Sequence, residues 1–387
     1  NFGQNPTFSG QVTAGTYTDS NGKGLFKYAP PSGFLALCED NLPTPAIADP
    51  GEHFKTVLWR GDGNNGHSIT GVGFQPDLVW LKERTNTSSH QWHDSVRGAG
   101  RLLMSNATGS SNVESYSATY LYSLDSDGFT LGTSGGVNAS TDNYVAWCWK
   151  AGGAAVSNTD GSLTTQVSVN QDAGFSIGTF TGDVANTHTI GHGLGKVPAM
   201  VIVKERTGNS GWAIYHKARG NTKVSYLNFT DGEYTETGDT SSWNATDPTS
   251  SVFSVGKNGA TNDNTLVFYA WAEIEGYNKF GSYKGNGNAD GPFVYCGFKP
   301  AWIMIKQTND SNNWHIADSS RKSVNPVNMV LRANLSNAES ANNTGFNIDF
   351  LSNGFKLRST NDELNENNST YIFAAFAESP FQTANAK

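Results

Sequence analysis

The sequence predicts an all-β protein, made of three tandem β-sandwich modules of about a hundred residues each and a short N-terminal leader rich in strand and proline. Three observations predict this class: a proline-led apolar segment occurs three times, polar turn residues separate many short apolar runs, and no long apolar stripe of helical period is present. We expect the leader at 1–50, module 1 at 51–153, a linker plus module 2 at 154–278, and module 3 at 279–387.

The repeat is clearest in the segments PDLVWLK, PAMVIVK and PAWIMIK, which begin at Pro76, Pro198 and Pro300. The proline recurs after 122 and then 102 residues, and a following Trp recurs after 120 and then 102. The constant order of landmarks predicts domain-sized copies, with the recurring Trp in the core. The further landmarks are Trp92, Trp212, Trp314; Arg97, Arg219, Arg321; and Phe129, Phe253, Phe355.

The connections between modules differ in composition. Prolines 30, 31, 43, 45 and 50 disfavour helix in the leader, and we expect Asn41–Pro50 to act as a linker. Gly152–Gly174 is rich in Gly, Ser and Thr, which predicts the boundary between modules 1 and 2. Glu273–Lys279 is a short join and predicts rigid coupling of modules 2 and 3. Each proline-led strand carries apolar residues on both faces, which predicts burial on both sides.

Composition excludes several classes of partner. The formal net charge of −8 and the pI near 5.5 argue against nucleic acid, which is bound by basic surfaces. We find no apolar run of about 18 residues, so we expect no membrane insertion. Cys38, Cys148 and Cys296 are too few and too scattered for a disulfide framework or a zinc site, and we interpret Cys148 and Cys296 as buried free thiols.

No stretch predicts a catalytic residue, a metal site or a cofactor. His188 and His192 form an HxxxH pair in a segment that disfavours helix, so we expect no metal there. The turns Asp62–Gly66 and Asn286–Gly291 offer calcium-type oxygens, and Arg60-Gly61-Asp62 matches an integrin-type tripeptide, but ordinary turn chemistry explains them. Glycoside hydrolysis needs a carboxylate pair. The available carboxylates lie in turns or at matching module ends, and we assign structural roles to Asp94, Asp125, Asp127, Asp318, Glu273 and Glu378.

Two tryptophans are candidate ligand-binding residues, Trp243 and Trp59. Neither recurs in type between the modules, and the same holds for Trp302. Trp243 lies in the polar loop TSSWNATD, where an exposed ring flanked by Asn, Ser and Thr is typical of a platform for sugars. The alternative is that this loop folds back and buries the ring in its own module.

The repeats also resemble a known family. HGLGKVPAMVIVKERT, GPFVYCGFKPAWIMIK, LSNGFKLR and YIFAAFAESPF are similar to repeats in tail-fibre and tail-associated proteins of tailed bacteriophages, marine and cyanobacterial phages among them, over roughly Phe54 to Lys387. NFGQ at Asn1–Gln4 and APPSGFLALCEDNLPTP at Ala29–Pro45 resemble the end of a SPRY-like, lectin-type sandwich, although TFSGQVTAGTYTDSNGKGL separates them here. The resemblance implies a virion structural or adhesion role and transfers no catalytic residue.

We therefore expect a virion protein, part of a phage appendage, that contributes to host-surface attachment. Its partners would be other virion proteins and a host-surface glycan or protein, and the fibre resemblance implies a homo-oligomer, with a trimer as the expected state. Repetition of weakly binding modules would raise avidity. Two alternatives remain open: a structural or decoration protein of the capsid or tail that binds no ligand, and a polysaccharide depolymerase or a cellular extracellular adhesin.

Overall fold

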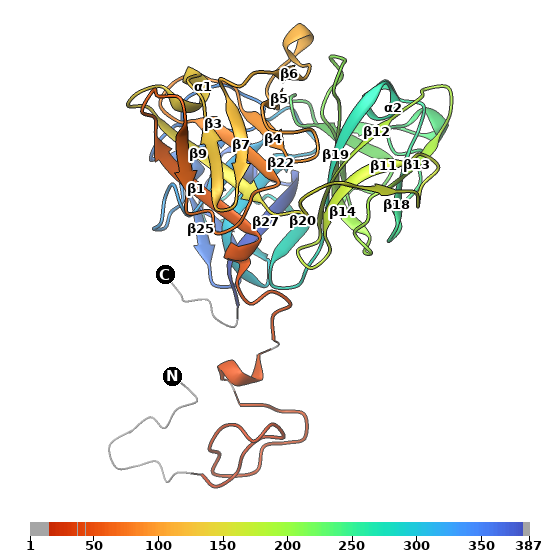
Figure 1. The fold of residues 1–387 in the computed structure, drawn as a ribbon. Helices are drawn as coiled ribbons and strands as arrows, with labels where there is room; N and C mark the ends of the chain where they lie inside the picture. The colour runs from red at the N-terminus through yellow and green to blue at the C-terminus, as the bar shows by residue number, and fades with distance from the viewer. Residues whose placement is uncertain (1–14, 37, 43, 382–387) are drawn as a thin grey trace.

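The computed structural model of the chain describes residues 15–36, 38–42 and 44–381. These residues form antiparallel sheets joined by turns and very short helices, so the predicted all-β class is confirmed. Figure 1 shows a body of strands and a leader that extends from one end of it. The string at Asn1–Gln4 that resembles the lectin-type sandwich lies outside the described residues.

Module 1 contains two sheets, a large one of order β1-β9-β3-β4-β5-β6 and a small one of order β2-β8-β7. Val57 and Cys148 of the large sheet share a hydrophobic cluster with Ile69 and Phe129 of the small one, which is the packing of a β-sandwich. The elements are β1 (Phe54–Arg60), β2 (His67–Thr70), β3 (Leu78–Glu83), β4 (Gln91–Asp94), β5 (Arg101–Met104), η3 (Gly109–Ser111), β6 (Ser115–Tyr116), β7 (Leu121–Asp125), β8 (Gly128–Leu131), α1 (Gly135–Asn138) and β9 (Asn143–Trp149).

Module 2 has a large sheet of order β10-β11-β12-β19-β14-β15-β16-β17 and a small sheet of β13 and β18. Phe268 of the large sheet packs with Phe253 of the small one, at a ring-centroid distance of 5.3 Å. The elements are β10 (Val156–Asn158), β11 (Thr165–Asn170), β12 (Phe175–Thr181), β13 (His188–Gly191), β14 (Pro198–Glu205), β15 (Ala213–His216), β16 (Lys223–Tyr226), β17 (Tyr234–Thr235), η4 (Gly238–Thr240), β18 (Val252–Val255), α2 (Gly259–Asn262) and β19 (Thr265–Ala272).

Module 3 repeats the arrangement, with a large sheet of order β20-β27-β22-β23-β24 and a small sheet of order β21-β26-β25. Phe373 and Phe355 pack across the two sheets, at a ring-centroid distance of 5.3 Å. The elements are β20 (Asn278–Lys284), β21 (Phe293–Tyr295), β22 (Phe298–Gln307), β23 (His315–Asp318), β24 (Leu331–Arg332), η5 (Thr344–Phe346), β25 (Ile348–Leu351), β26 (Gly354–Leu357), α3 (Asp362–Asn365) and β27 (Thr370–Pro380).

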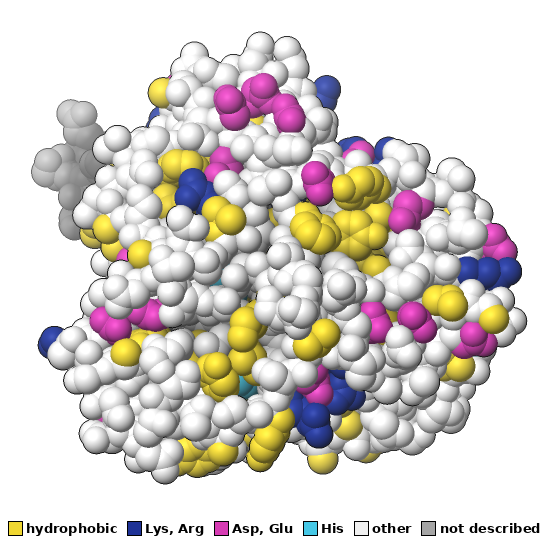
Figure 2. All heavy atoms as spheres, turned by 90° about the horizontal axis from the view of Figure 1, so that it is seen from above, with side chains coloured by type: hydrophobic (Ala, Val, Ile, Leu, Met, Phe, Trp, Pro, Cys, Tyr) yellow, Lys and Arg dark blue, Asp and Glu magenta, His cyan; other side chains and the backbone are white. Residues whose placement is uncertain are grey.

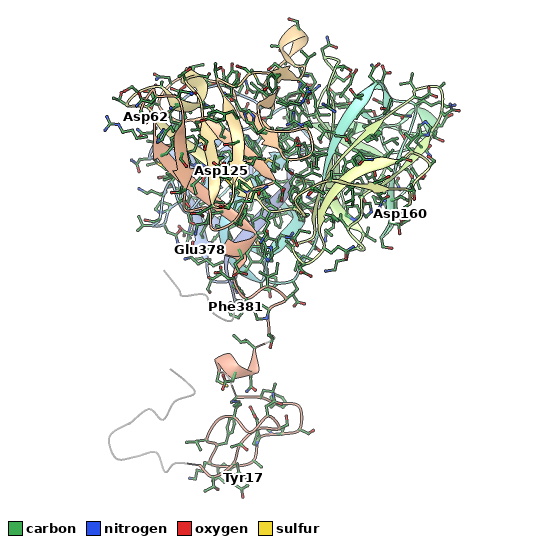
Figure 3. All side chains as sticks on the ribbon, viewed as in Figure 1. Tyr17, Asp62, Asp125, Asp160, Glu378 and Phe381 are labelled. Carbon is green, nitrogen blue, oxygen red and sulfur yellow. The ribbon has the colours of Figure 1, made fainter. Side chains whose placement is uncertain are left out.

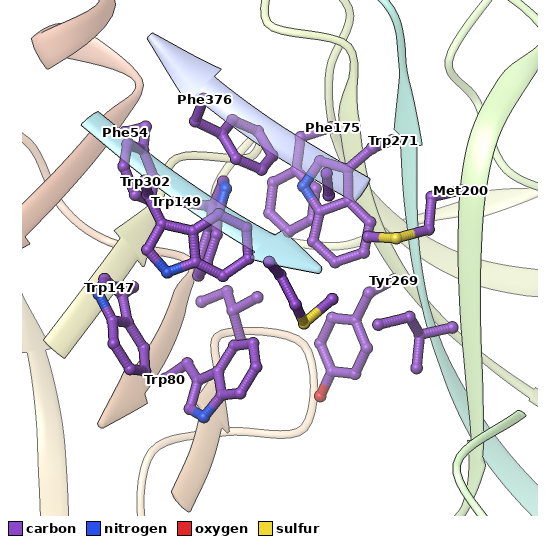
Figure 4. Packing of buried hydrophobic residues seen from close by; sticks show 14 of the residues in the cluster. Phe54, Trp80, Trp147, Trp149, Phe175, Met200, Tyr269, Trp271, Trp302 and Phe376 are labelled. Carbon is purple, nitrogen blue, oxygen red and sulfur yellow. The ribbon is translucent and has the colours of Figure 1, made fainter. Parts of the chain in front are cut away.

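The three large sheets turn their second faces to one central hydrophobic core, shown in Figure 4. On β3, Leu78 and Trp80 enter this central core, while Val79 and Leu81 belong to the sandwich core of module 1. Side chains of a strand alternate between its faces, so a strand with a core on each side must be apolar throughout. Every residue of β3 and β14 is buried, which confirms the prediction of strands buried on both sides.

The modules contact one another head to tail in a closed ring. The backbone N–H of Glu114 in module 1 donates to the carbonyl of Arg206 in module 2, at 2.7 Å. Glu233 of module 2 donates in the same way to Thr308 of module 3. Glu339 of module 3 donates to Arg84 of module 1, at 2.9 Å, which closes the ring. Heterologous contacts that close in this way form cyclic assemblies, and here the assembly is a single chain.

A lysine at the end of each proline-led strand, namely Lys82, Lys204 and Lys306, is buried beside these interfaces. Its Nζ donates to backbone carbonyls, as from Lys306 to Thr230 of module 2 at 3.0 Å. Burial lowers the pKa of all three lysines to about 8. The recurring Lys therefore satisfies buried backbone carbonyl groups, within the same module for Lys82 and Lys204 and between modules 2 and 3 for Lys306.

Strand register corrects the predicted alignment of the tryptophans. Trp92 faces Trp80 on β3, and the corresponding positions of β15 and β23 hold Ile214 and Ile316. The residue that matches Trp212 and Trp314 is therefore His90, two positions earlier. The Nε1 of Trp212 donates to Met104 O of module 1 at 3.2 Å, and that of Trp314 to Tyr226 O of module 2 at 3.0 Å. Trp92, Trp212 and Trp314 are all buried, so their predicted core location is confirmed.

Most of Gly152–Gly174, the predicted boundary between modules 1 and 2, is not a free linker but already belongs to module 2. Strands β10 and β11 lie within it, and β11 pairs with β12 along five residues. Val167 packs in the sandwich core of module 2 and Ala173 in the central core. The small and polar composition is that of strands at a sheet edge, where one face is exposed.

The described residues of the leader have little regular structure. They contain η1 (Glu39–Asn41), η2 (Pro50–Glu52) and one bridge, between Tyr17 and Phe26. The buried carboxylate of Asp19 organises its loops by accepting from several groups, including the backbone N–H of Ala36 at 2.7 Å. Ile47 then anchors the exit of the leader in the central core.

Candidate functional site

Trp243 is not an exposed platform, so that prediction is wrong. Only 2% of the residue is accessible, and its ring packs edge-on against Tyr215, with centroids 5.8 Å apart. The loop folds back because the backbone N–H of Gly256 donates to Ser242 O next to the Trp. Trp243 therefore completes the sandwich core of module 2, which is the alternative that the sequence left open.

Trp59 on β1 also has a packing role. Its ring stacks on Tyr144, with centroids 5.2 Å apart and planes 12° apart, and its Nε1 donates to Val137 O at 3.1 Å. The same register position holds Phe180 in module 2 and Tyr283 in module 3, so an aromatic residue does recur here. Trp59 is half-buried, and Tyr144 already covers one face of its indole.

The candidate carboxylates have the structural roles that we predicted. Asp94 binds the buried Arg97, at 2.5 Å, and Asp318 binds Arg321 in the same way. The turn residue Asp127 accepts two backbone N–H groups, and Asp125 accepts the hydroxyl of Thr130. Glu273 and Glu378 form ion pairs with Lys217 and Lys299 at the ends of their modules.

A buried Asn that the sequence analysis did not single out holds the Gly/Asn/Asp turn in each module. In module 1 the Nδ2 of Asn138 donates to Asp62 Oδ1 and Asn64 O, and its Oδ1 accepts the N–H of Asp62. Asn262 and Asn365 do the same in the other modules. A Cβ on Gly61 would lie 2.1 Å from Ala139 O, so this turn requires Gly. The Arg-Gly-Asp tripeptide is thus one copy of a structural motif.

The histidine pair does not converge. His188 lies in β13, and His192 follows this strand with its Nε2 3.2 Å from Thr249 O. Four residues of extended chain span about 13 Å, too far for two ligands of one ion. Across the described ranges, no group of three or more His, Cys, Asp or Glu side chains is placed to hold a metal. The described part of the chain also contains no helix long and apolar enough to cross a membrane.

The best candidate site is a cleft of about 540 Å³ where the leader meets the body, which we call the junction cleft. In Figure 3, Phe381 marks its end of the body, next to the leader. Tyr295, the last residue of β21, is 62% exposed, and Phe381 is also exposed. The lining consists of Leu42, Thr44, Pro45, Ala46, Glu273, Glu275, Gly276, Asn278, Lys279, Tyr295, Cys296, Gly297, Pro380 and Phe381.

The polar groups of the junction cleft come from the join between modules 2 and 3. Glu273 contacts Lys217 and Lys279 and accepts the backbone N–H of Phe280 at 3.0 Å. Burial favours a raised pKa for Glu273, but Lys217 and the Phe280 N–H outweigh it and lower the pKa. Glu273 is therefore ionised, and Glu275 adds a second carboxylate. The predicted short join thus becomes one wall of the cleft.

The fold and the junction cleft together place the chain in a structural class. It is an all-β protein in which three sandwiches surround one core, with an open cleft of polar and aromatic residues at one end. The chain belongs to the family described as a domain of unknown function, DUF7483, whose model matches residues 49–380. This match spans the strands of all three modules. Comparisons with curated proteins and with solved structures find no significant match.

Proposed function

We propose that the chain is a structural protein of a phage appendage, a tail fibre or a tail-associated protein, and that it contributes to host-surface attachment by binding a glycan in the junction cleft. The junction cleft is the observation that carries this proposal. Aromatic side chains stack on the C–H faces of sugars, while carboxylates, amides and ammonium groups bond their hydroxyls. Tyr295 and Phe381 supply the first kind of group, and Glu275 and Lys279 the second.

The closed ring supports this role because it gives the cleft a rigid wall. Lys279 lies on β20 and Tyr295 on β21, strands of the large and the small sheet of module 3, and Glu273 follows the last strand of module 2 directly. Groups held on packed strands lose little conformational entropy when a ligand binds. At the end far from the leader, Figure 2 shows mainly backbone and side chains that are neither charged nor hydrophobic, with scattered hydrophobic patches.

A matched pair of variants on one strand tests the proposal. Tyr295→Ala removes the exposed ring of the cleft, whereas Phe293→Ala removes an exposed ring two residues earlier on β21 that does not line it. We expect saturable binding to host cells or their surface polysaccharide, weakened about tenfold or more by Tyr295→Ala and little changed by Phe293→Ala. Equal binding by both variants and the parent chain would rule out the cleft.

A depolymerase is the second candidate, because Glu273 and Glu275 line the same cleft. Glycoside hydrolysis needs one carboxyl with a raised pKa as general acid, and the pKa of Glu273 is lowered by Lys217 and the Phe280 N–H against the effect of burial. We therefore propose binding without cleavage. Release of reducing ends from host polysaccharide, abolished by Glu275→Gln, would instead establish the enzyme.

The homo-oligomer stays a prediction, as do the virion location and the other virion proteins as partners. The ring already joins three modules within one chain, so a trimer of chains must use other surfaces. Light scattering of the purified chain measures this directly: a mass of three times 41.5 kDa supports the trimer, and 41.5 kDa at high concentration contradicts it.

A folded chain that binds neither host cells nor isolated host glycans would contradict the attachment role. We would then propose the alternative, a structural protein of the capsid or tail that binds no ligand. Localisation in purified particles by labelled antibody would then distinguish a tail position from a capsid position.

A further inference from the structure

A second cleft lies at the interface between modules 1 and 2. It encloses about 390 Å³ and is lined by Arg101, Val113 and Glu114 of module 1 and by Arg206, Thr207 and Thr265 of module 2. We call it the arginine cleft. The side chain of Arg101 is 44% exposed and that of Arg206 is 20% exposed, while Glu114 is almost covered.

Glu114 has no acceptor capacity left. Its Oε1 accepts from Arg101 Nη1 at 2.9 Å and from Arg206 Nη2 at 2.8 Å. Its Oε2 accepts from Arg206 Nε at 2.9 Å and from Arg97 Nη1 at 3.1 Å. A carboxylate has about four acceptor positions, and these four bonds fill them.

The charges in the arginine cleft do not balance. Asp94 neutralises Arg97, with an Nε to Oδ2 distance of 2.5 Å. Arg101 and Arg206 are left with the single negative charge of Glu114, so one positive charge is uncompensated. A guanidinium has five N–H donors, of which Arg101 uses one and Arg206 two within the described part of the chain.

A surplus shared by arginines of two modules is specific to this interface, because Arg219 and Lys223, which also share one carboxylate, Glu233, both belong to module 2. Between modules 3 and 1, Glu339 meets only Arg84 and Arg321, and Asp318 neutralises the latter. Between modules 2 and 3, Thr308 stands where the cross-module arginine would be. In the arginine cleft, by contrast, the hydroxyls of Thr207 and Thr265 add two further donors that bond no other described residue.

We propose that the arginine cleft binds an oxyanion, such as the carboxylate of an acidic sugar or a phosphate group, through Arg101 and Arg206. Planar guanidinium groups form paired, charge-assisted bonds to both kinds of group. The two threonine hydroxyls complete the donor set. The inference does not depend on attachment or on the junction cleft, because any ligand with an exposed oxyanion satisfies the same donors.

Calorimetric titration of the full chain with inorganic phosphate and, separately, with an oligoglucuronate tests the proposal. We expect saturable binding of at least one probe, weakened by added salt. Arg101→Gln should weaken it about tenfold or more, and Thr207→Val should weaken it by a smaller factor without a change of charge. Binding of only one probe identifies the source of the oxyanion as phosphate or as sugar acid.

Arg60→Gln is the matched control, because Arg60 is an exposed strand arginine outside the cleft that bonds only a backbone carbonyl. It should change binding by less than about twofold. Equal losses with Arg60→Gln and Arg101→Gln would show non-specific charge attraction and overturn the site, as would the absence of saturable binding by the parent chain. Thermal melting checks folding, and Thr207→Val provides the test if Arg101→Gln fails to fold.

Discussion

Glu339 near the end of the chain forms a two-pronged ion pair with Arg84 near its beginning, with Arg84 Nη2 2.7 Å from Glu339 Oε1. The pair joins module 3 to module 1 across 255 positions of sequence. Glu339 also binds Arg321 of its own module, at 2.8 Å, so the buried carboxylate is satisfied from both sides. This contact turns three consecutive sandwiches into a ring.

Arg84→Gln should therefore weaken the body. The substitution leaves Glu339 buried with one arginine instead of two, and we expect the free energy of unfolding to fall by about 1 to 3 kcal/mol. Denaturant unfolding measures the change. Arg358→Gln is the control, because this arginine is exposed in its pairs with Asp290 and Asp349 and should cost less than about 1 kcal/mol. Equal losses would contradict a special role for the ring closure.

Trp302→Ala should destabilise all three modules together. The ring of Trp302 lies 6.2 Å from that of Trp80 and 5.8 Å from those of Trp149 and Phe376, centroid to centroid, in the central core. Removing a buried indole costs about 3 to 5 kcal/mol. We expect calorimetry to show one unfolding transition in the parent chain and one in the variant, shifted to lower temperature. A separate early transition for module 3 alone would argue against the shared core.

Trp243→Ala should lower stability and leave ligand affinity unchanged. The residue fills the sandwich core of module 2, so its loss leaves a cavity worth about 3 to 5 kcal/mol. Binding measured well below the melting temperature of the variant separates the two effects. An affinity loss in a fully folded variant would restore Trp243 as a ligand contact.

Asn262→Ala tests the turn motif. The amide of Asn262 donates to Asp183 O, Asn186 O and Gly256 O, so its removal leaves three carbonyls without this donor. We expect a loss of about 2 to 4 kcal/mol in denaturant unfolding. Asn186→Ala, which removes only an exposed bond to Asp183, serves as the control and should cost less than about 1 kcal/mol. Similar losses for both would mean that the turn does not depend on the buried amide.

His216 should make stability depend on pH. Burial lowers the pKa of His216 to about 4, and its Nε2 donates to Phe373 O across the interface of modules 2 and 3. The unfolded chain binds a proton on this residue below about pH 6.5, whereas the folded chain does not until about pH 4. Stability is therefore lost as the pH falls between these values, by up to about 3 kcal/mol.

His216→Gln keeps a donor for Phe373 O and removes the titrating group. We expect denaturant unfolding measured from pH 7 to pH 4 to show a shallower decline for the variant. Some slope should remain, because burial also lowers the pKa of His192 to about 4 and that of His93 to about 3. An unchanged slope would show that His216 does not titrate as the structure implies.

The repeat, the all-β class and the strands buried on both faces could be predicted because they depend on local order along the chain. The shift of the tryptophans was also visible in principle. Arg97 recurs after 122 residues, as Pro76 does, whereas Trp92 recurs after 120. The two spacings differ by two residues, which is one full period of side-chain alternation in a strand. The residue of module 1 that occupies the position of Trp212 is therefore His90, two residues before Trp92.

The candidate site could not be predicted. Tyr295 and Glu275 belong to an edge strand and a connecting loop, and neither carries a motif. They line one cleft only because the leader packs there, close to the end of β27. The burial of Trp243 could not be predicted for the same reason. The polar residues beside it in the sequence indicate that the loop is partly exposed to solvent, but they do not determine the direction of the Trp243 ring.

The sequence by itself therefore determined the strands, their order and the apolar pattern that buries them, because side-chain alternation and turn chemistry act between near neighbours. Only the tertiary structure decided that the modules close into a ring, that Glu114 meets three arginines and that Trp243 is buried. Those facts depend on contacts between residues far apart in the chain, and their energies arise only when distant surfaces exclude water together.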